Sequence, residues 1–422
     1  MRKRVGFADQ SRAASTALIV GEPPANPFSA KKRKSAGEIS EKDKGGGVAT
    51  SVLWAKMGSS EFKKSLQRKR PIYCDGSFSL EYTWDMDDIF LRGVNLGGWL
   101  VLEKWMTPSL FAGTKAIDEY TFMQTPGAVE KIDQHRRSFI TEADFKWLRK
   151  HGINAIRIPV GYWVLEGDES YVGARKYLDW ALVMAEKYQL KVVIDVHGLP
   201  GSQNGWDHSG RVGRALWYKD AAYRQRSVEA VARIADRYKD SVMLWGIQVI
   251  NEPRLAPYQL VSFYRLRHYY RQVYQRLTSI VPPAVAIIVS DAFAPRLMSG
   301  VLHPSSHSVV LDVHLYHMAT PFAKWLSVDW FLRKTMRREK MLKRLSLTQP
   351  IIIGEWSGVI SGETMRHVPK EQHDELFARY VALQQDVYRT TAGWFYWSYK
   401  AEKPGQWNFR SQVEAGLIDV VS

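Results

Sequence analysis

The chain has 422 residues, enough for one large α/β domain, and a formal net charge of +16 at neutral pH. The excess positive charge lies in residues 1–70, which hold 16 Lys and Arg against six Asp and Glu. This distribution argues against a nucleic-acid enzyme, whose basic residues would surround its site. No apolar run approaches the roughly 18 residues of a membrane span, so we expect no membrane-spanning segment.

Residues 1–70 have no sustained apolar periodicity and contain Gly45-Gly46-Gly47 and the basic run Lys31-Lys32-Arg33-Lys34. We predict a basic arm of low order over residues 1–70 and one catalytic-type domain over residues 71–422. Cys74 is the only cysteine and there is no Asn-x-Ser/Thr sequon. With no readable export signal either, these features fit a reducing compartment.

From about residue 71 the chain alternates short apolar runs with helical patterns. Thr141 is predicted to open a helix that Gly152 ends, and helical spacing is also present over Arg175–Tyr188 and Ala221–Tyr238. The apolar runs predict parallel strands buried on both faces. Eight strands with helical crossovers indicate a (β/α)₈ TIM barrel. The predicted strands are Gly93–Leu96, Ala155–Pro159, Val192–Val196, Gly246–Ile250, Ala286–Ser290, Val309–Leu315, Ile351–Glu355 and Trp394–Trp397.

Polar or aromatic side chains recur where these strands end, and any one of them could be an ordinary loop or capping residue. As a set they indicate an active site, because barrel enzymes carry their chemistry at the carboxyl ends of the strands. Two glutamates, Glu252 and Glu355, follow apolar runs in matched positions, and a pair of carboxylates is the minimum for cleaving a glycosidic bond. The set is Arg157, His197, Asn251, Glu252, His314, Tyr316, Glu355 and Trp397.

The segments that carry these residues resemble glycoside hydrolase family 5, and most of all its fungal exo-β-1,3-glucanase branch. The resemblance runs from about Arg92 to Asp419. Asn251-Glu252-Pro253 alone is only moderately specific, whereas Gly201-Ser202-Gln203-Asn204-Gly205 after His197 narrows the match to this branch. Further markers are Arg92–Trp99, Met106–Phe111, Arg157-Ile158-Pro159, His314-Leu315-Tyr316, Gly354-Glu355-Trp356 and Gly393–Ser398.

The resemblance implies a retaining double displacement, with Glu252 as the acid/base and Glu355 as the nucleophile. The acid has to stay protonated and the nucleophile ionised at the working pH. Arg157 would hold Glu355 as a carboxylate through its fixed charge, and Tyr316 could donate a hydrogen bond to it. Asn251 would bind the sugar 2-hydroxyl.

The family also suggests how the sugar is held. His197 and His314 would be polar walls of the pocket, although either could be a core histidine. Trp397 would stack under the sugar, unless it is an ordinary core residue, and a cis peptide bond is expected between it and Ser398.

Two further positions bear on specificity. Glu103 would bind hydroxyls of the terminal sugar, with a solvated loop acid as the alternative. Trp206 would be an aromatic at the pocket entrance. Relatives carry a second aromatic residue just after the position of Tyr316, as the partner of the one at Trp206. Here His317-Met318-Ala319 stands at that place without an aromatic side chain, and Phe322 and Trp325 are the candidate substitutes.

The resemblance thus implies an exo-β-1,3-glucanase that releases glucose from β-glucan or related β-glucosides. Alternatives are a family 5 β-glucosidase acting on steryl- or lipid-linked glucosides, and a non-catalytic carbohydrate-binding barrel. We expect no cofactor, no metal, no nucleic-acid partner and a monomer; no short-spaced His/Cys/Asp cluster suggests a metal site. The family suggests an extracellular or cell-wall location, which conflicts with the missing export signal, so the location is left open.

Overall fold

The computed structural model describes residues 90–255, 260–303, 306–317 and 325–420. The proposed boundary between the arm and the domain at residue 70 lies outside the described residues and stays a prediction. Phe322, one of the two candidate entrance residues, lies outside them as well. No helix in the described part of the chain is long and apolar enough to cross a bilayer.

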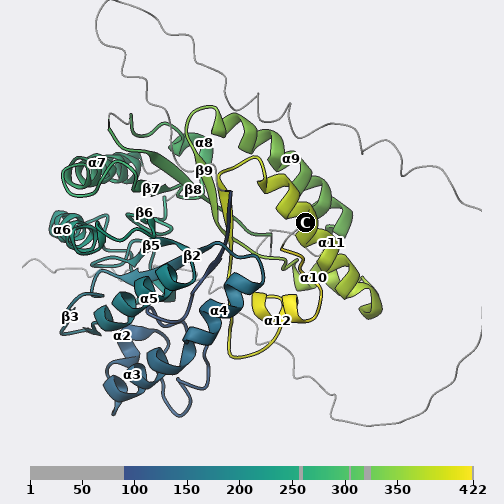
Figure 1. The fold of residues 1–422 in the computed structure, drawn as a ribbon, viewed down its shortest axis with the longest axis horizontal. Coiled ribbons are helices and arrows are strands. Elements are labelled where there is room, and N and C mark those ends of the chain that lie inside the picture. The colour runs from purple at the N-terminus through teal and green to yellow at the C-terminus, as the bar shows by residue number, and fades with distance from the viewer. Residues whose placement is uncertain (1–89, 256–259, 304–305, 318–324, 421–422) are drawn as a thin grey trace, which may run out of the picture. The chain divides into compact units, whose positions relative to one another are not determined.

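Eight parallel strands close into a barrel in the order β1-β10-β9-β8-β7-β6-β5-β2 (Figure 1). This confirms the predicted fold, and every predicted strand boundary lies within two residues of the observed one. A small antiparallel hairpin of β3 and β4 was not predicted. The strands are β1 Leu91–Asn95, β2 Ala155–Gly161, β3 Gly167–Asp168, β4 Tyr171–Val172, β5 Lys191–Gly198, β6 Leu244–Gln248, β7 Ala286–Ser290, β8 Val309–Leu315, β9 Ile351–Trp356 and β10 Gly393–Tyr396.

The helices lie outside the barrel, and α9 and α11 pack against each other (Figure 1). The predicted helices at residues 142–150, 175–187 and 221–238 are present, and the first begins where the Thr141 amide donates to the Asp144 carboxylate (2.8 Å). The α-helices are α2 Glu119–Phe122, α3 Ala128–Phe139, α4 Glu142–Lys150, α5 Arg175–Lys187, α6 Ala221–Tyr238, α7 Leu260–Leu277, α8 Pro295–Met298, α9 Val328–Ser346, α10 Gly362–Met365, α11 His373–Tyr388 and α12 Phe409–Glu414.

The inside of the barrel changes from apolar to charged along the strands. Toward the amino ends of the strands the interior is a separate apolar cluster that includes Ala155, Val193 and Val310. Because side chains alternate between the two faces of a strand, the inward-facing residues two positions further on are Arg157, Asp195 and Asp312. All three are completely buried. A charged layer therefore lies directly beneath the carboxyl ends of the strands.

Asp144 joins α4 to the C-terminal part of the domain, and its loss should destabilise the protein. Its carboxylate accepts hydrogen bonds from Tyr399 (2.8 Å), Lys400 (3.0 Å) and Arg410 (3.1 Å), and its side chain is 3% exposed. Removing one partner of a buried ion pair costs about 3 kcal/mol. We therefore expect Asp144→Ala to lower the free energy of unfolding by about that much, measured by denaturant titration.

The matched control is Glu142→Ala, in the same helix. Glu142 pairs with Lys187 on the surface, where both side chains are about half exposed, and such pairs contribute about 0–1 kcal/mol. Equal losses for the two variants would contradict the role given to Asp144.

Candidate active site

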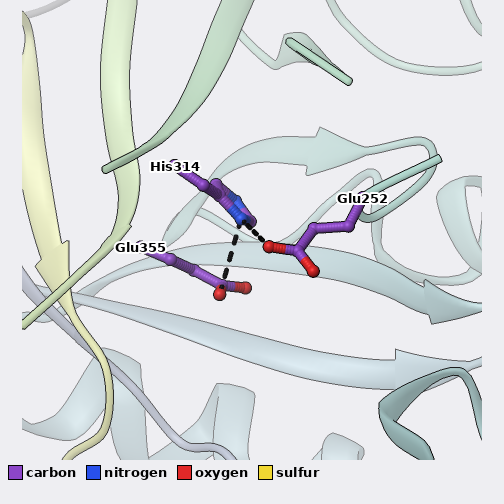
Figure 2. A group of neighbouring side chains, drawn as sticks. All are labelled: Glu252, His314 and Glu355. Atoms are coloured by element: carbon purple, nitrogen blue, oxygen red, sulfur yellow. Dashed lines mark hydrogen bonds and ion pairs between the residues drawn. The ribbon is translucent and has the colours of Figure 1, made fainter. Parts of the chain in front are cut away.

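Glu252 and Glu355, about a hundred residues apart in the chain, meet at the carboxyl end of the barrel. Glu252 follows β6 and Glu355 lies near the end of β9. His314, on β8, lies between them (Figure 2). One oxygen of each carboxylate and one nitrogen of His314 lie within 4.8 Å of one another. Glu252 itself has a left-handed backbone (φ +43°), a conformation that is costly for a non-glycine residue and is enriched at functional sites.

Arg157 is the central cation of the charged layer. It donates to Glu355 Oε1 (3.0 Å) through Nη1 and to Asn251 Oδ1 (2.9 Å) through Nη2. Nη2 also lies 3.1 Å from Asp195 and 3.7 Å from Asp312. Burial would lower the pKa of Arg157, but these carboxylates outweigh burial and raise it. The arginine is therefore a fixed charge that holds the nucleophile candidate and orients the neighbouring amide.

His314 is surrounded by carboxylates. Its Nδ1 lies 2.7 Å from Glu252 Oε1 and 3.4 Å from Glu355 Oε2, and its Nε2 lies 3.1 Å from Asp312 Oδ2. Burial acts to lower the pKa of His314, but the charges of Glu355 and Asp312 and the hydrogen bonds raise it well above its usual value. His314 is therefore an imidazolium that donates from both nitrogens. Tyr316, two residues later, donates to Glu355 Oε2 (2.9 Å).

The charge of this imidazolium lowers the pKa of both glutamates, but only Glu252 also accepts a hydrogen bond from it. Burial raises the pKa of Glu355 to about 7 against the opposing charges of His314 and Arg157. Burial acts the same way on Glu252, but the short hydrogen bond and the charge of His314 outweigh it and lower the pKa to about 2. In this arrangement His314 donates at 2.7 Å to Glu252 rather than to Glu355. The roles expected from the sequence, Glu252 as the acid and Glu355 as the nucleophile, stay predictions.

His197 is a neutral member of the same network. The Asn251 oxygen already accepts from Arg157, so its amide nitrogen is the donor to His197 Nε2 (3.3 Å). The proton of His197 is then on Nδ1, which donates to Asp195 (2.5 Å). Burial and the charge of Arg157 lower the pKa of His197 well below its usual value. His197 and His314 are thus held in different charge states.

Trp397 lies beside this network, with its ring parallel to that of His197 (centroids 5.5 Å apart, 10° between planes). The peptide bond between Trp397 and Ser398 is cis, as expected. Glu103 is 3% exposed, so it is not a solvated loop acid. Its carboxylate accepts from Trp105 Nε1 (2.9 Å), and burial, followed by the charge of Asp207, raises its pKa well above the usual value.

Trp206 pairs with a second aromatic residue. The ring of Trp206 lies 5.9 Å from that of Phe293, at 70°, and Phe293 is 49% exposed. His317, which follows Tyr316, is buried. The described residues therefore place Phe293, from the loop after β7, beside Trp206, and sequence reasoning missed it.

Three other neighbours of the site were also missed: Asp195, Asp312 and His208. A signal for the first two is present, because the tripeptide Asp-Val-His occurs at residues 195–197 and again at 312–314. In a strand, residues two apart share a face, so each carboxylate must lie beside its histidine. His208 carries no such signal.

Glu252, His314 and Glu355 also form a donor set that a divalent transition metal could accept. In this structure, however, carboxylates already occupy both nitrogens of His314. The three groups satisfy one another by hydrogen bonding, which fits acid–base chemistry better than metal binding.

Comparisons with known proteins agree with this geometry. A "Probable glucan 1,3-beta-glucosidase A" from Aspergillus fumigatus is 34% identical over 377 residues, covering 80% of this chain and 88% of the relative. "Glucan 1,3-beta-glucosidase 1" from Schizosaccharomyces pombe is 31% identical over 405 residues, covering 88% and 95%.

Among solved structures, a rutinosidase from Aspergillus niger matches with a TM-score of 0.67 at 22% identity, covering 78% of this chain and 98% of that one. The endoglucanase Cel5A from Thermotoga maritima matches with a TM-score of 0.52 at 17% identity, covering 80% and 98%. At these identities both matches support the fold alone. The family model for cellulase (glycosyl hydrolase family 5) matches residues 119–403. The chain therefore belongs to glycosyl hydrolase family 5.

Proposed function

We propose that this chain is a retaining exo-β-1,3-glucanase, which releases glucose from the non-reducing ends of β-1,3-glucan. The observation that carries the proposal is the approach of Glu252 and Glu355, with one oxygen of each within 4.8 Å. Retaining glycosidases place their carboxyl groups about 5–5.5 Å apart, whereas inverting enzymes need about 6.5–9.5 Å to admit a water. The two named relatives support the β-1,3 linkage and glucose as the product.

In the first step Glu355 attacks the anomeric carbon while Glu252 gives its proton to the leaving oxygen. Glu252 must carry the proton when this step begins, so His314 then donates to Glu355 instead of Glu252. That exchange is short, because Nδ1 already lies 3.4 Å from Glu355. Arg157 and Tyr316 hold the attacking carboxylate in position.

In the second step water attacks the glycosyl-enzyme and Glu252, now ionised, takes the proton of the water. Once Glu355 is bound to sugar its charge is gone, so His314 can return to Glu252 and stabilise the carboxylate that forms. We assign Asn251 to the 2-hydroxyl, Trp397 to the sugar face, and Glu103, His197 and His314 to the other hydroxyls of the terminal sugar. Trp206 is assigned to the next sugar.

The test is an early-time product analysis on laminarin, cellulose and a glucosylsterol, with the anomer followed by NMR. Release of β-glucose alone from laminarin is the expected result. Oligosaccharides at early times would contradict the exo assignment, and α-glucose would contradict retention. Hydrolysis of the glucosylsterol alone would move the substrate class to lipid-linked glucosides, and no turnover of any substrate would favour a non-catalytic barrel.

A further inference from the structure

His208 is a second histidine against Glu252, and none of the steps above uses it. It lies in the short 3₁₀ helix Asp207–Ser209, in the loop after β5. Its Nε2 is 3.3 Å from Glu252 Oε2, the oxygen that His314 does not bind. The two oxygens of the acid/base candidate therefore each face a histidine, one from β8 and one from this loop.

The imidazole of His208 has two other rings as close neighbours. The ring of His197 lies 5.0 Å away at 64° and that of Trp206 lies 5.5 Å away at 48°. The helix that carries it is fixed by a hydrogen bond between Ser209 Oγ and Ser202 Oγ (2.6 Å). These contacts hold Nε2 close to Glu252 Oε2, at 3.3 Å.

The tautomer of His208 follows from its other nitrogen. Nδ1 is buried and has no hydrogen-bond partner among the described residues. A buried N–H without an acceptor is rarer and more costly than a buried lone pair without a donor. The proton of the neutral ring is therefore on Nε2, where it can be donated to Glu252. Burial, opposed by the charge of Glu252, lowers the pKa of His208 to about 4, which keeps the ring neutral.

We propose that His208 is a positioning residue for Glu252, whose Nε2–H binds Oε2 and stabilises the ionised form of this carboxyl, the form that acts as base in the second step. The inference rests on the proposed function, because it concerns the acid/base step. His314 lies 3.4 Å from Glu355, whereas in the described part of the chain His208 pairs with Glu252 alone of the two glutamates, so it can favour ionised Glu252 without competing for the nucleophile. It also leaves Oε1 as the oxygen that exchanges its proton with the sugar.

The sign of the effect on pH dependence can be worked out. A hydrogen bond donated to a carboxylate favours the charged form and lowers its pKa. Without that bond the pKa of Glu252 rises, so the acid stays protonated to a higher pH. The alkaline limb of kcat/KM, which reports the essential acid of the free enzyme, should then move upward. The other charged or titratable groups facing Glu252 and His208 are Glu103, His197, Asp207, Asp291, His314, Tyr316 and Glu355, and the substitution leaves all of them in place.

The experiment compares His208→Leu, which lacks the donor, with His208→Gln, which keeps a side-chain N–H. The substrate is 2,4-dinitrophenyl β-glucoside, whose leaving group needs little acid assistance, so that the second step limits kcat. We expect the alkaline limb of kcat/KM for a less activated aryl glucoside to move up by about one pH unit in the Leu variant. On the dinitrophenyl substrate, the acid limb of kcat, which reports Glu252 as the base of the second step, should move up in the same direction. His208→Gln should recover most of both effects.

An unchanged alkaline limb in an active Leu variant, or a limb moved to lower pH, would overturn the proposal. If the Leu variant does not fold, His208→Met and His208→Phe fill a similar volume without an N–H and replace it. A wild-type enzyme inactive on both aryl glucosides would overturn the proposed function and this inference together. An active wild type with an unmoved limb in the variants would overturn the inference alone.

Discussion

Glu355→Ala is expected to lower kcat/KM on aryl β-glucosides by about 10⁴-fold or more, because it removes the atom that forms the covalent intermediate. The space left behind is lined by Arg157 and Tyr316, both donors, so a small anion should fit there. Azide should therefore restore turnover and give α-glucosyl azide, with the configuration inverted. Rates with and without azide, and NMR of the product, measure the effect.

The control is Glu363→Ala, on the exposed side of α10, which should retain wild-type rates. Retention of activity in the Glu355 variant without azide would remove this residue from the nucleophile role. A β-glucosyl azide product would instead indicate that the two glutamates have exchanged roles.

Glu252→Ala should affect substrates according to their leaving group. We expect kcat/KM to fall by about 10²–10⁴-fold for poor leaving groups, which need a proton, and far less for 2,4-dinitrophenolate, which does not. The glycosyl-enzyme should then accumulate, because no base activates water in the second step. Azide should react with this intermediate and give β-glucosyl azide, with the configuration retained.

The comparison uses a series of aryl glucosides with leaving groups of increasing pKa. A steep dependence of kcat/KM on leaving-group pKa in the variant, and a shallow one in the wild type, is the expected pattern. Parallel slopes for the two enzymes would show that Glu252 does not supply the proton.

The barrel could be predicted from the sequence because each strand is a short apolar run with a polar residue at its end. Residues such as Glu252 and Glu355 were identified because their setting repeats and resembles a family pattern. Asp195 and Asp312 were missed because the cation that pairs with both of them is not close to either in the sequence. Their partner, Arg157, lies on β2, and only closure of the barrel brings the three together.

The order of the two glutamate pKa values could not be predicted from the sequence for a related reason. It depends on a difference of 0.7 Å between two distances from the same His314 nitrogen, 2.7 Å to Glu252 and 3.4 Å to Glu355. His208 and Phe293 lie in loops whose direction the strand pattern does not specify. The division into arm and domain, and the roles of individual site residues, stay predictions.

The charged layer inside the barrel also constrains how this sequence can change over time. Arg157, Asp195 and Asp312 are completely buried. The guanidinium of Arg157 lies 3.1 Å from the carboxylate of Asp195 and 3.7 Å from that of Asp312. Losing any one of them leaves an uncompensated charge in the interior. Losing the arginine together with one of the aspartates changes the net charge of the buried layer less. Substitutions in this layer should therefore be tolerated in combinations rather than singly. A pairwise mutational scan should show strong positive epistasis among these three positions, and little between them and the surface.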